Sequence, residues 1–127
     1  MKNKITLLAA GLLGLVFVVF GLNFFLKFLP VPSPPADSHA ASFMGAMYAT
    51  GMLTVIKILE IVGGILVAIP RTRNFGLLVL GPIVVNILFF NIFIAPGGWT
   101  QPPVILITLL SAFLLWTAKD KFVKLLN

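Results

Sequence analysis

A chain of 127 residues with 60% hydrophobic and 9% charged residues has room for one domain, and that domain carries too much apolar surface to hide from water. The absence of cysteine and the single histidine exclude disulfides, thiolate metal sites and two-histidine haem ligation within the chain. The net charge of +6 would suggest nucleic acid in a soluble protein, but here the bases flank hydrophobic segments. We therefore expect a lipid bilayer as the partner, and neither nucleic acid nor a metal.

The hydrophobic segments are long enough to cross a bilayer as helices, for which about 20 mostly apolar residues are needed. Within a single domain of residues 1–127 we predict four spans, at 5–29, 52–69, 75–95 and 104–118. The last is short unless its helix continues into the following lysines. Strands of a β-barrel would alternate in polarity, and the apolar run at 12–20 does not. The predicted fold is all-α, a membrane-spanning four-helix bundle.

The first span also resembles the start of a signal peptide, because Lys2 and Lys4 precede its apolar run. That run is too long for the apolar part of a signal peptide, and prolines separate it from the small residues at 38–40, so we expect a retained span. Near its end Asn23 and Lys27 are four residues apart and share a helix face. Asn23 is a ligand-binding candidate. Lys27 is a secondary candidate that fits an anchor at the outer headgroups better.

The segment between the first two spans combines polar residues with apolar ones at 43–48, in a pattern that fits a short amphipathic helix. Asp37 or Ser38 would serve as its N-cap. We expect such a helix to lie at the outer interface or to dip into the bundle, and to break at Thr50-Gly51. A plain loop fits this segment equally well.

Lys57 and Glu60 are the strongest functional signal, because they lie three residues apart near the middle of the second span. Two such charges cost roughly 5 to 7 kcal/mol at the centre of a span. We expect them to pair and face the bundle interior, with Gly64 allowing close approach of a neighbouring helix. The pair would either fix helix register or bind a polar headgroup, a proton or a partner, and we favour binding because such groups are costly to keep. The glycines of the first span are interpreted as packing positions.

In the third span Pro82 removes a backbone donor, and Asn86 follows four residues later on the same face. We predict a kink there and expect Asn86 to hydrogen-bond across the bundle to Glu60 or Lys57, as structural glue or as a ligand contact. Asn91 lies closer to the outer surface and is a secondary candidate.

The basic residues near the spans indicate the orientation, because lysine and arginine beside spans are retained in the cytoplasm. They lie at the two ends of the chain and in the turn at 70–73, whereas the two loops on the opposite side carry none. We expect both termini and this turn in the cytoplasm and the protein in the cytoplasmic (inner) membrane. Trp99 and Trp116 then fall near opposite interfaces, as aromatic belts do.

Several motifs resemble the DoxX family of small membrane proteins in order and spacing, over nearly the whole chain. They are Gly21-Leu22-Asn23 through Phe28-Leu29-Pro30 with Pro32, Thr50-Gly51, Lys57-Ile58-Leu59-Glu60 and Pro82-Ile83-Val84-Val85-Asn86-Ile87. The resemblance implies a four-helix membrane fold. It also suggests that the family's polar positions correspond to Asn23, Lys57, Glu60 and Asn86.

The activities implied by the resemblance belong to different classes. Some DoxX-like proteins are linked to quinone-coupled sulfur oxidation or membrane redox complexes, and distant eukaryotic relatives resemble cargo receptors or receptor-assembly chaperones. Family members often carry histidine near the end of the third span, where this chain has Asn91. Proton handling here would therefore have to rely on Glu60 and Lys57.

We expect an accessory membrane subunit that supports quinone-linked redox chemistry, with a bound quinone as borrowed cofactor and no intrinsic one. Lys57 would donate to the quinone headgroup, Glu60 would orient it or take a proton, and Asn86 would complete the hydrogen bonds. No catalytic residue can be assigned. The alternative is a non-enzymatic assembly, chaperone or cargo-interaction protein that holds another membrane protein, or its own copy, on the same polar face. A proton-coupled carrier of small solutes is a third reading.

Overall fold

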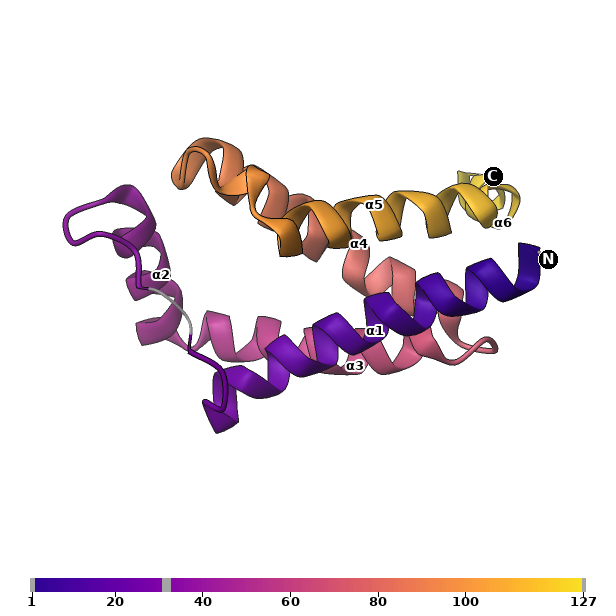
Figure 1. The fold of residues 1–127 in the computed structure, drawn as a ribbon, viewed down its shortest axis with the longest axis horizontal. Coiled ribbons are helices and arrows are strands. Elements are labelled where there is room, and N and C mark those ends of the chain that lie inside the picture. Colours follow the sequence, from indigo (N-terminus) through magenta and orange to yellow (C-terminus); the bar gives the residue numbers. More distant parts are fainter. Residues whose placement is uncertain (1, 31–32, 127) are drawn as a thin grey trace.

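The structure is a computed structural model that describes residues 2–30 and 33–126, and every regular element within these ranges is helical. The prediction of an all-α chain is confirmed in this part. Figure 1 shows α1 beside α3, α4 beside α5, and the two ends of the chain at the same end of the molecule. The elements in order are α1 (Lys2–Leu26), α2 (His39–Thr50), α3 (Met52–Ala68), α4 (Arg73–Phe89), the π-helical turn η1 (Phe90–Ile94), the 3₁₀ turn η2 (Gly98–Thr100), α5 (Pro102–Thr117), α6 (Lys119–Val123) and the 3₁₀ turn η3 (Lys124–Leu126).

Two helical segments, Lys4–Leu26 and Arg73–Ile94, are long and apolar enough to cross a membrane on their own. Two bent pairs of helices also qualify if each pair is counted as one span: α2 with α3, bent by 84°, and α5 with the segment Lys119–Leu126, bent by 74°. The described residues therefore contain two to four candidate spans, consistent with an integral membrane protein. Taken alone, α3 and α5 have 17 and 16 residues, about 25 Å of helix each.

The segment between the first two predicted spans forms the helix α2, so the loop alternative is wrong. Ser38 is its N-cap, because its Oγ accepts a hydrogen bond of 3.1 Å from the backbone N–H of Ala41. Gly51 ends the helix in the left-handed region, with φ of 84°, and its N–H donates to the carbonyl of Tyr48. A left-handed residue at this position lets the chain turn sharply into α3. The predicted break at Thr50-Gly51 is confirmed.

Helices α1 and α3 approach each other at backbone distance. A Cβ added to Gly64 would lie 2.8 Å from the carbonyl oxygen of Gly14, and one added to Gly14 would collide with the carbonyl oxygen of Gly64. A Cβ at Gly21 would lie 2.6 Å from Cγ1 of Ile61. Small residues allow such an approach, which strengthens van der Waals contact between helices in lipid. The packing interpretation is confirmed for Gly14, Gly21 and Gly64, whereas Gly11 faces open space.

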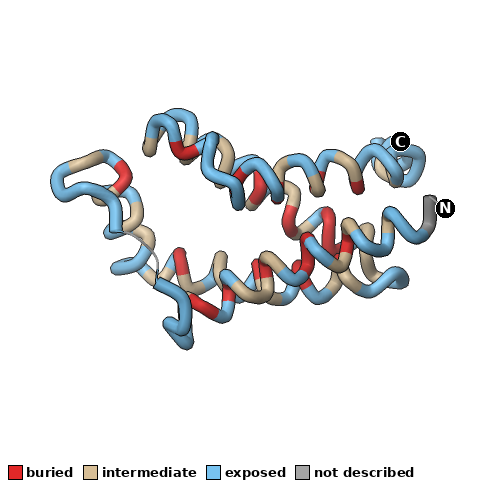
Figure 2. Tube along the Cα trace, in the orientation of Figure 1, coloured by how far each residue is buried: buried red, intermediate tan, exposed pale blue. Residues whose placement is uncertain are grey.

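The apolar core lies where α1, α3, α4 and α5 meet, and Figure 2 shows its buried positions facing one another across the helices. Many large apolar side chains on the outer surfaces of these helices stay exposed, including Leu8, Leu109 and Phe75. An apolar surface of this extent suits hydrocarbon better than water. The buried core residues are Ala10, Leu13, Phe17, Val67, Leu77, Leu80, Val84, Ile107 and Leu114.

The basic turn between α3 and α4 caps the end of α3. Thr72 Oγ1 donates to the carbonyl of Leu66 at 2.8 Å, and Arg73 Nε donates to the carbonyl of Val67 at 3.0 Å. These carbonyls belong to the last turn of α3, where they lack partners within the helix, and a cation there also suits the helix dipole. The arginine predicted to mark the cytoplasmic side therefore also stabilises the turn.

Pro82 lies inside α4, which remains helical from Arg73 to Phe89. The kink predicted at this proline stays a prediction. Beyond Phe89 the chain widens into the π-helical turn η1, where the N–H of Ala95 donates to the carbonyl of Phe90, five residues back. This π turn was not anticipated from the sequence, since no proline or glycine marks its start.

Candidate functional site

Lys57 and Glu60 of α3 form the salt bridge found among the described residues. Lys57 Nζ lies 3.4 Å from Glu60 Oε1, and the two side chains are 22% and 5% exposed. A short charge-assisted hydrogen bond would be about 2.7 to 2.9 Å. The pair is therefore loose, with the Glu60 side chain nearly enclosed and the Lys57 side chain partly exposed.

The position of Glu60 follows from the two glycines that come next on its helix face. Gly64, four residues later, lies against Gly14 of α1, and Gly63, three residues later, lies against Leu80 of α4. Residues three and four apart are neighbours on a helix surface. Glu60 therefore faces the seam between α1 and α4, one turn from the point where α3 touches both helices. Its burial agrees with the expectation that this carboxylate faces the interior.

The carboxylate of Glu60 retains hydrogen-bonding capacity. An ionised carboxylate offers about four lone-pair sites. Among the described residues, the Glu60 side chain accepts one hydrogen bond, which comes from Lys57. A group that donates a hydrogen bond, or an ammonium drawn closer, would be strongly stabilised there, because the surroundings are apolar and the local dielectric is low. This spare capacity is the chemical feature that a bound headgroup would use.

The expected contact from Asn86 to this pair is wrong. Asn86 is exposed, and the hydrogen bonds of the described residues include none from its side chain to Glu60 or Lys57. The reason is helical register: α4 turns Leu80 and Val84 into the core, and a residue two positions beyond Val84 lies about 200° further around the helix. Asn86 therefore points to the outer flank of α4, away from the core.

Asn23 is buried, but its side chain closes the end of α1. Its Oδ1 accepts from the N–H of Leu29 at 2.7 Å, and its Nδ2 donates to the carbonyl of Leu29 at 3.2 Å. Lys27 ends the helix in the left-handed region, with φ of 53°, and its own N–H donates to the carbonyl of Asn23. Both ends of the Asn23 amide are thus occupied by backbone. The structure assigns Asn23 a local capping contact rather than a ligand contact, and it leaves the Lys27 side chain exposed.

Asn91 also has a local structural contact. Its Nδ2 donates to the carbonyl of Ile87 at 2.7 Å, and its Oδ1 lies against the α-carbon side of Gly98, where no Cβ would fit. The side chain thereby joins η1 to η2. Among the described residues no hydrogen bond joins Asn23, Asn86 or Asn91 to Lys57 or Glu60, so the hydrogen-bonded part of the predicted polar cluster reduces to the salt bridge. Pro32 of the first motif lies outside the described residues.

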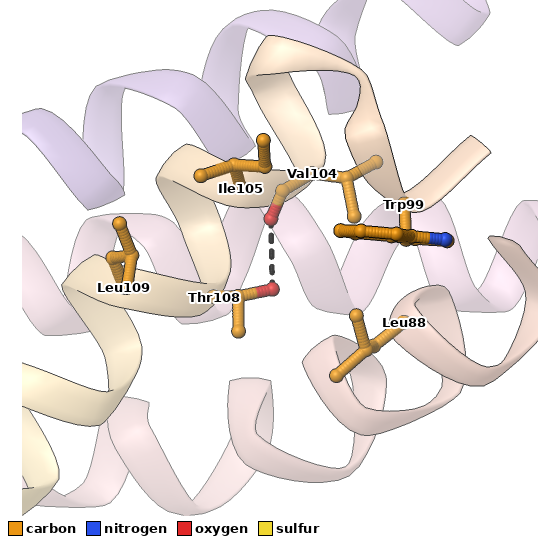
Figure 3. A pocket seen from close by; sticks show the side chains of 6 residues that line it. All are labelled: Leu88, Trp99, Val104, Ile105, Thr108 and Leu109. Carbon is orange, nitrogen blue, oxygen red and sulfur yellow. Dashed lines mark hydrogen bonds between the residues drawn. The ribbon is translucent and has the colours of Figure 1, made fainter. Parts of the chain in front are cut away.

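Two pockets among the described residues are apolar, and neither is lined by α3, the helix of the salt bridge. One, of about 130 Å³, lies between α4 and α5 beside the ring of Trp99. Figure 3 shows that the hydroxyl of Thr108 in this pocket donates its hydrogen bond to the carbonyl of Val104 in its own helix. The other, about 560 Å³, is an open groove between α1 and α5, lined by Val16 and Phe20 on one side and Pro103 and Leu106 on the other. Neither is lined by Lys57 or Glu60.

Ser111 is a buried polar residue that the sequence reasoning missed. It lies on α5 between the core residues Ile107 and Leu114, and its hydroxyl has no hydrogen-bond partner among the described residues. The spacing in the sequence could have indicated its burial, because Ser111 follows Ile107 by four residues and therefore shares a helix face with it. The hydroxyl is buried on the side of α5 that faces the core.

No protein-family model, curated protein or solved structure matches this chain. The resemblance to the DoxX family therefore rests on the sequence motifs alone.

Proposed function

We propose that the chain is a four-helix bundle of the cytoplasmic membrane in which α1, α3, α4 and α5 each cross the bilayer and both termini lie in the cytoplasm. The placement of the two chain ends at one end of the molecule supports this topology (Figure 1). So does the position of Arg71 and Arg73 in the turn that follows α3. The short helices α2 and α6 leave the axes of α3 and α5 at steep angles, as segments lying along the membrane surfaces would.

The topology can be tested with single cysteines, because the natural chain has none. We expect a membrane-impermeant maleimide to label Thr100→Cys on intact cells, and to label Lys121→Cys only after the membrane is permeabilised. Both positions are exposed, so side-chain access does not separate them. Equal labelling of the two variants on intact cells would contradict the proposed orientation.

We infer that the protein supports quinone-linked redox chemistry in the DoxX-like manner, by holding the polar headgroup of a quinone at Lys57 and Glu60. One observation carries this proposal: a carboxylate only 5% exposed, inside a bundle of apolar helices, is held by a single long contact to a lysine. Ionisable groups at this depth are costly and mark ligand or proton sites in membrane proteins. Asn86 and Asn23 are not part of the proposed site.

The donor set fits a quinone headgroup. The ammonium of Lys57 has three N–H donors, and Glu60 occupies one of them at 3.4 Å, so a quinone carbonyl would find a donor at the edge of the pair. Glu60 would hold the ammonium in place and accept a proton. When bound, the quinone carries the electrons. The chain has no cysteine and one histidine, so electrons would enter from a separate protein, and this subunit would bind and orient.

The test is the quinone content of protein purified in mild detergent, measured by extraction and mass spectrometry per mole of folded chain. We expect Glu60→Gln and Lys57→Met to lower occupancy about tenfold, because a hydrogen bond to a charged group contributes roughly 1.5 to 3 kcal/mol. Lys27→Gln removes an exposed lysine and serves as the matched control. Folded wild-type protein without quinone, or equal occupancy in all variants, would contradict the proposal.

A second function, the assembly of other membrane proteins, is favoured by the outer flank of α4. Asn86 presents its amide there, and Pro82 leaves the carbonyl of Leu78 without its usual helical donor, with both residues exposed. Polar groups facing hydrocarbon lack partners, and a helix from another protein or a second copy would satisfy them. The polar face that would hold a partner is then this flank, and not the buried salt bridge.

Photocrosslinking distinguishes this function. A benzophenone amino acid at Phe89, on the same flank, should yield a protein adduct of discrete mass in native membranes. The matched control is the same label at Leu109, which is exposed on α5. Adducts at neither position, or the same adducts at both, would remove the case for a partner on this flank.

A further inference from the structure

The C-terminal segment Lys119–Leu126, formed by α6 and η3, lies across the end of the bundle. It is bent by 74° from α5, and Phe122 in its middle packs against the hydrophobic core. That contact fixes the bend, because straightening the chain would withdraw an aromatic ring from the core. Figure 1 shows the segment at the same end of the molecule as the start of α1, the end that holds both termini.

The segment is basic and its lysines are free to reach outward. Lys119, Lys121 and Lys124 are exposed, against the single acidic residue Asp120, and Lys4 of α1 is exposed at the same end of the molecule. No salt bridge ties any of these lysines to the rest of the described residues. Lys119 Nζ instead lies 4.6 Å from the ring centroid of Trp116, which gives the end of α5 a cationic and aromatic edge.

Apolar side chains lie between and beside these lysines, and most of them are more than half exposed. Val123 and Leu125 are exposed by more than half, Leu126 is 86% exposed, and Trp116 beside them is also open. A short helix that presents lysines together with bare leucines suits the boundary between headgroups and acyl chains. The leucines would enter the acyl region, while the flexible lysine stems carry their ammonium groups back to the headgroups.

We propose that residues 119–126 form a membrane-surface foot that binds the headgroups of anionic phospholipids in the leaflet next to the two termini. Charge complementarity selects this occupant: the foot has three lysines and one aspartate, and anionic headgroups supply the missing counter-charge. The bend and the Phe122 contact supply the geometry, because they hold the foot at 74° to α5. The proposal does not depend on quinone binding or on a protein partner.

Lipid selectivity tests the foot in the full-length protein. After reconstitution into phosphatidylcholine bilayers, the fractions of spin-labelled phosphatidylglycerol and phosphatidylcholine immobilised by the protein are compared by electron paramagnetic resonance. We expect phosphatidylglycerol to be preferred about fivefold or more, the contribution of about one lysine at an anionic surface. The preference should weaken in high salt. Lys119→Gln, Lys121→Gln and Lys124→Gln combined should reduce the preference by more than half, whereas Lys27→Gln should leave it unchanged.

The depth of the foot is a second measurement that does not depend on charge. A spin label at Leu126→Cys should be more accessible to oxygen than to a water-soluble nickel complex, and one at Lys121→Cys should show the reverse. Equal association of the two lipids with the wild-type protein, or an unchanged preference in the triple variant, would overturn the proposal. A water-exposed label at both positions would also overturn it, and would favour an acidic protein as the occupant.

Discussion

Helices α1 and α3 are joined by backbone contact, whereas α4 and α5 meet through large side chains. In the first pair the carbonyl of Gly14 lies where a side chain on Gly64 would have to be. In the second pair Leu88 and Val104 face each other across a space of about 130 Å³. Lipid supplies no hydrophobic force between helices, so close approach decides how firmly they pack. The contrast teaches that the glycines let α1 and α3 pack more closely than α4 and α5 do.

Polar groups follow the same division. On the α1 and α3 side, Asn23 bonds to backbone and Glu60 is enclosed beside Lys57. On the outer flank of α4, Asn86 is exposed and bonds to neither member of the salt bridge. The α1 and α3 side thus encloses Asn23 and Glu60, and α4 presents Asn86 outward, although Ser111 of α5 is also buried. The proposed headgroup site and the proposed partner surface correspond to these two regions.

The largest expected effect comes from filling the contact between α1 and α3. Gly14→Leu should lower the free energy of unfolding by about 3 kcal/mol or more, because its Cβ would collide with the backbone of Gly64 and neither backbone can yield cheaply. Reversible unfolding in mixed detergent micelles measures this. Gly11→Leu is the matched control on the same helix, with nothing within 4 Å of its Cβ, and should change stability by less than about 0.5 kcal/mol. Similar losses in both variants would abolish the distinction between the two pairs of helices.

An intermediate effect is expected from breaking the salt bridge on α3, in the closely packed pair of helices. Lys57→Met should destabilise the fold by about 2 kcal/mol, because it leaves the enclosed carboxylate of Glu60 without its counter-charge. The partial exposure of Lys57 keeps the effect below that of a fully buried pair. Adding Glu60→Leu should restore most of the loss, since an apolar pair of similar size needs no partner. A double variant as unstable as the single one would show that Glu60 does not depend on Lys57.

The smallest effect is expected from replacing the asparagines, one of which is buried and the other exposed. Asn23→Leu should lower the free energy of unfolding by about 1 to 2 kcal/mol, because two hydrogen bonds to the backbone of Leu29 are lost. Asn86→Leu should be neutral or slightly stabilising in detergent, because its exposed amide makes no bond to the salt bridge. Unfolding curves of the two variants side by side measure the difference. A larger loss for Asn86→Leu would place that amide in the structural core instead.

The helices and their order were predictable because long apolar runs and the proline and glycine breaks between them are local properties of the chain. The burial of Glu60 was predictable for a related reason: a charge on a membrane helix has little choice but to face protein. The failure at Asn86 came from register. The position of Asn86 along α4 could be predicted from the sequence. Which face of α4 packs against α3 depends on the contact of Gly63 with Leu80, between different helices of the chain.

By itself, the sequence determined that this chain is helical, suited to a bilayer, broken at Gly51 and marked by one pair of charges in an apolar segment. These follow from composition and spacing, which act over a few residues. Only the tertiary structure decided that Asn23 would close the end of α1, that Asn86 would turn outward and that Phe122 would fold the C-terminal foot across the bundle. The physical reason is that the helix packed against a face decides whether that face is buried, and the local sequence does not specify which helix packs there.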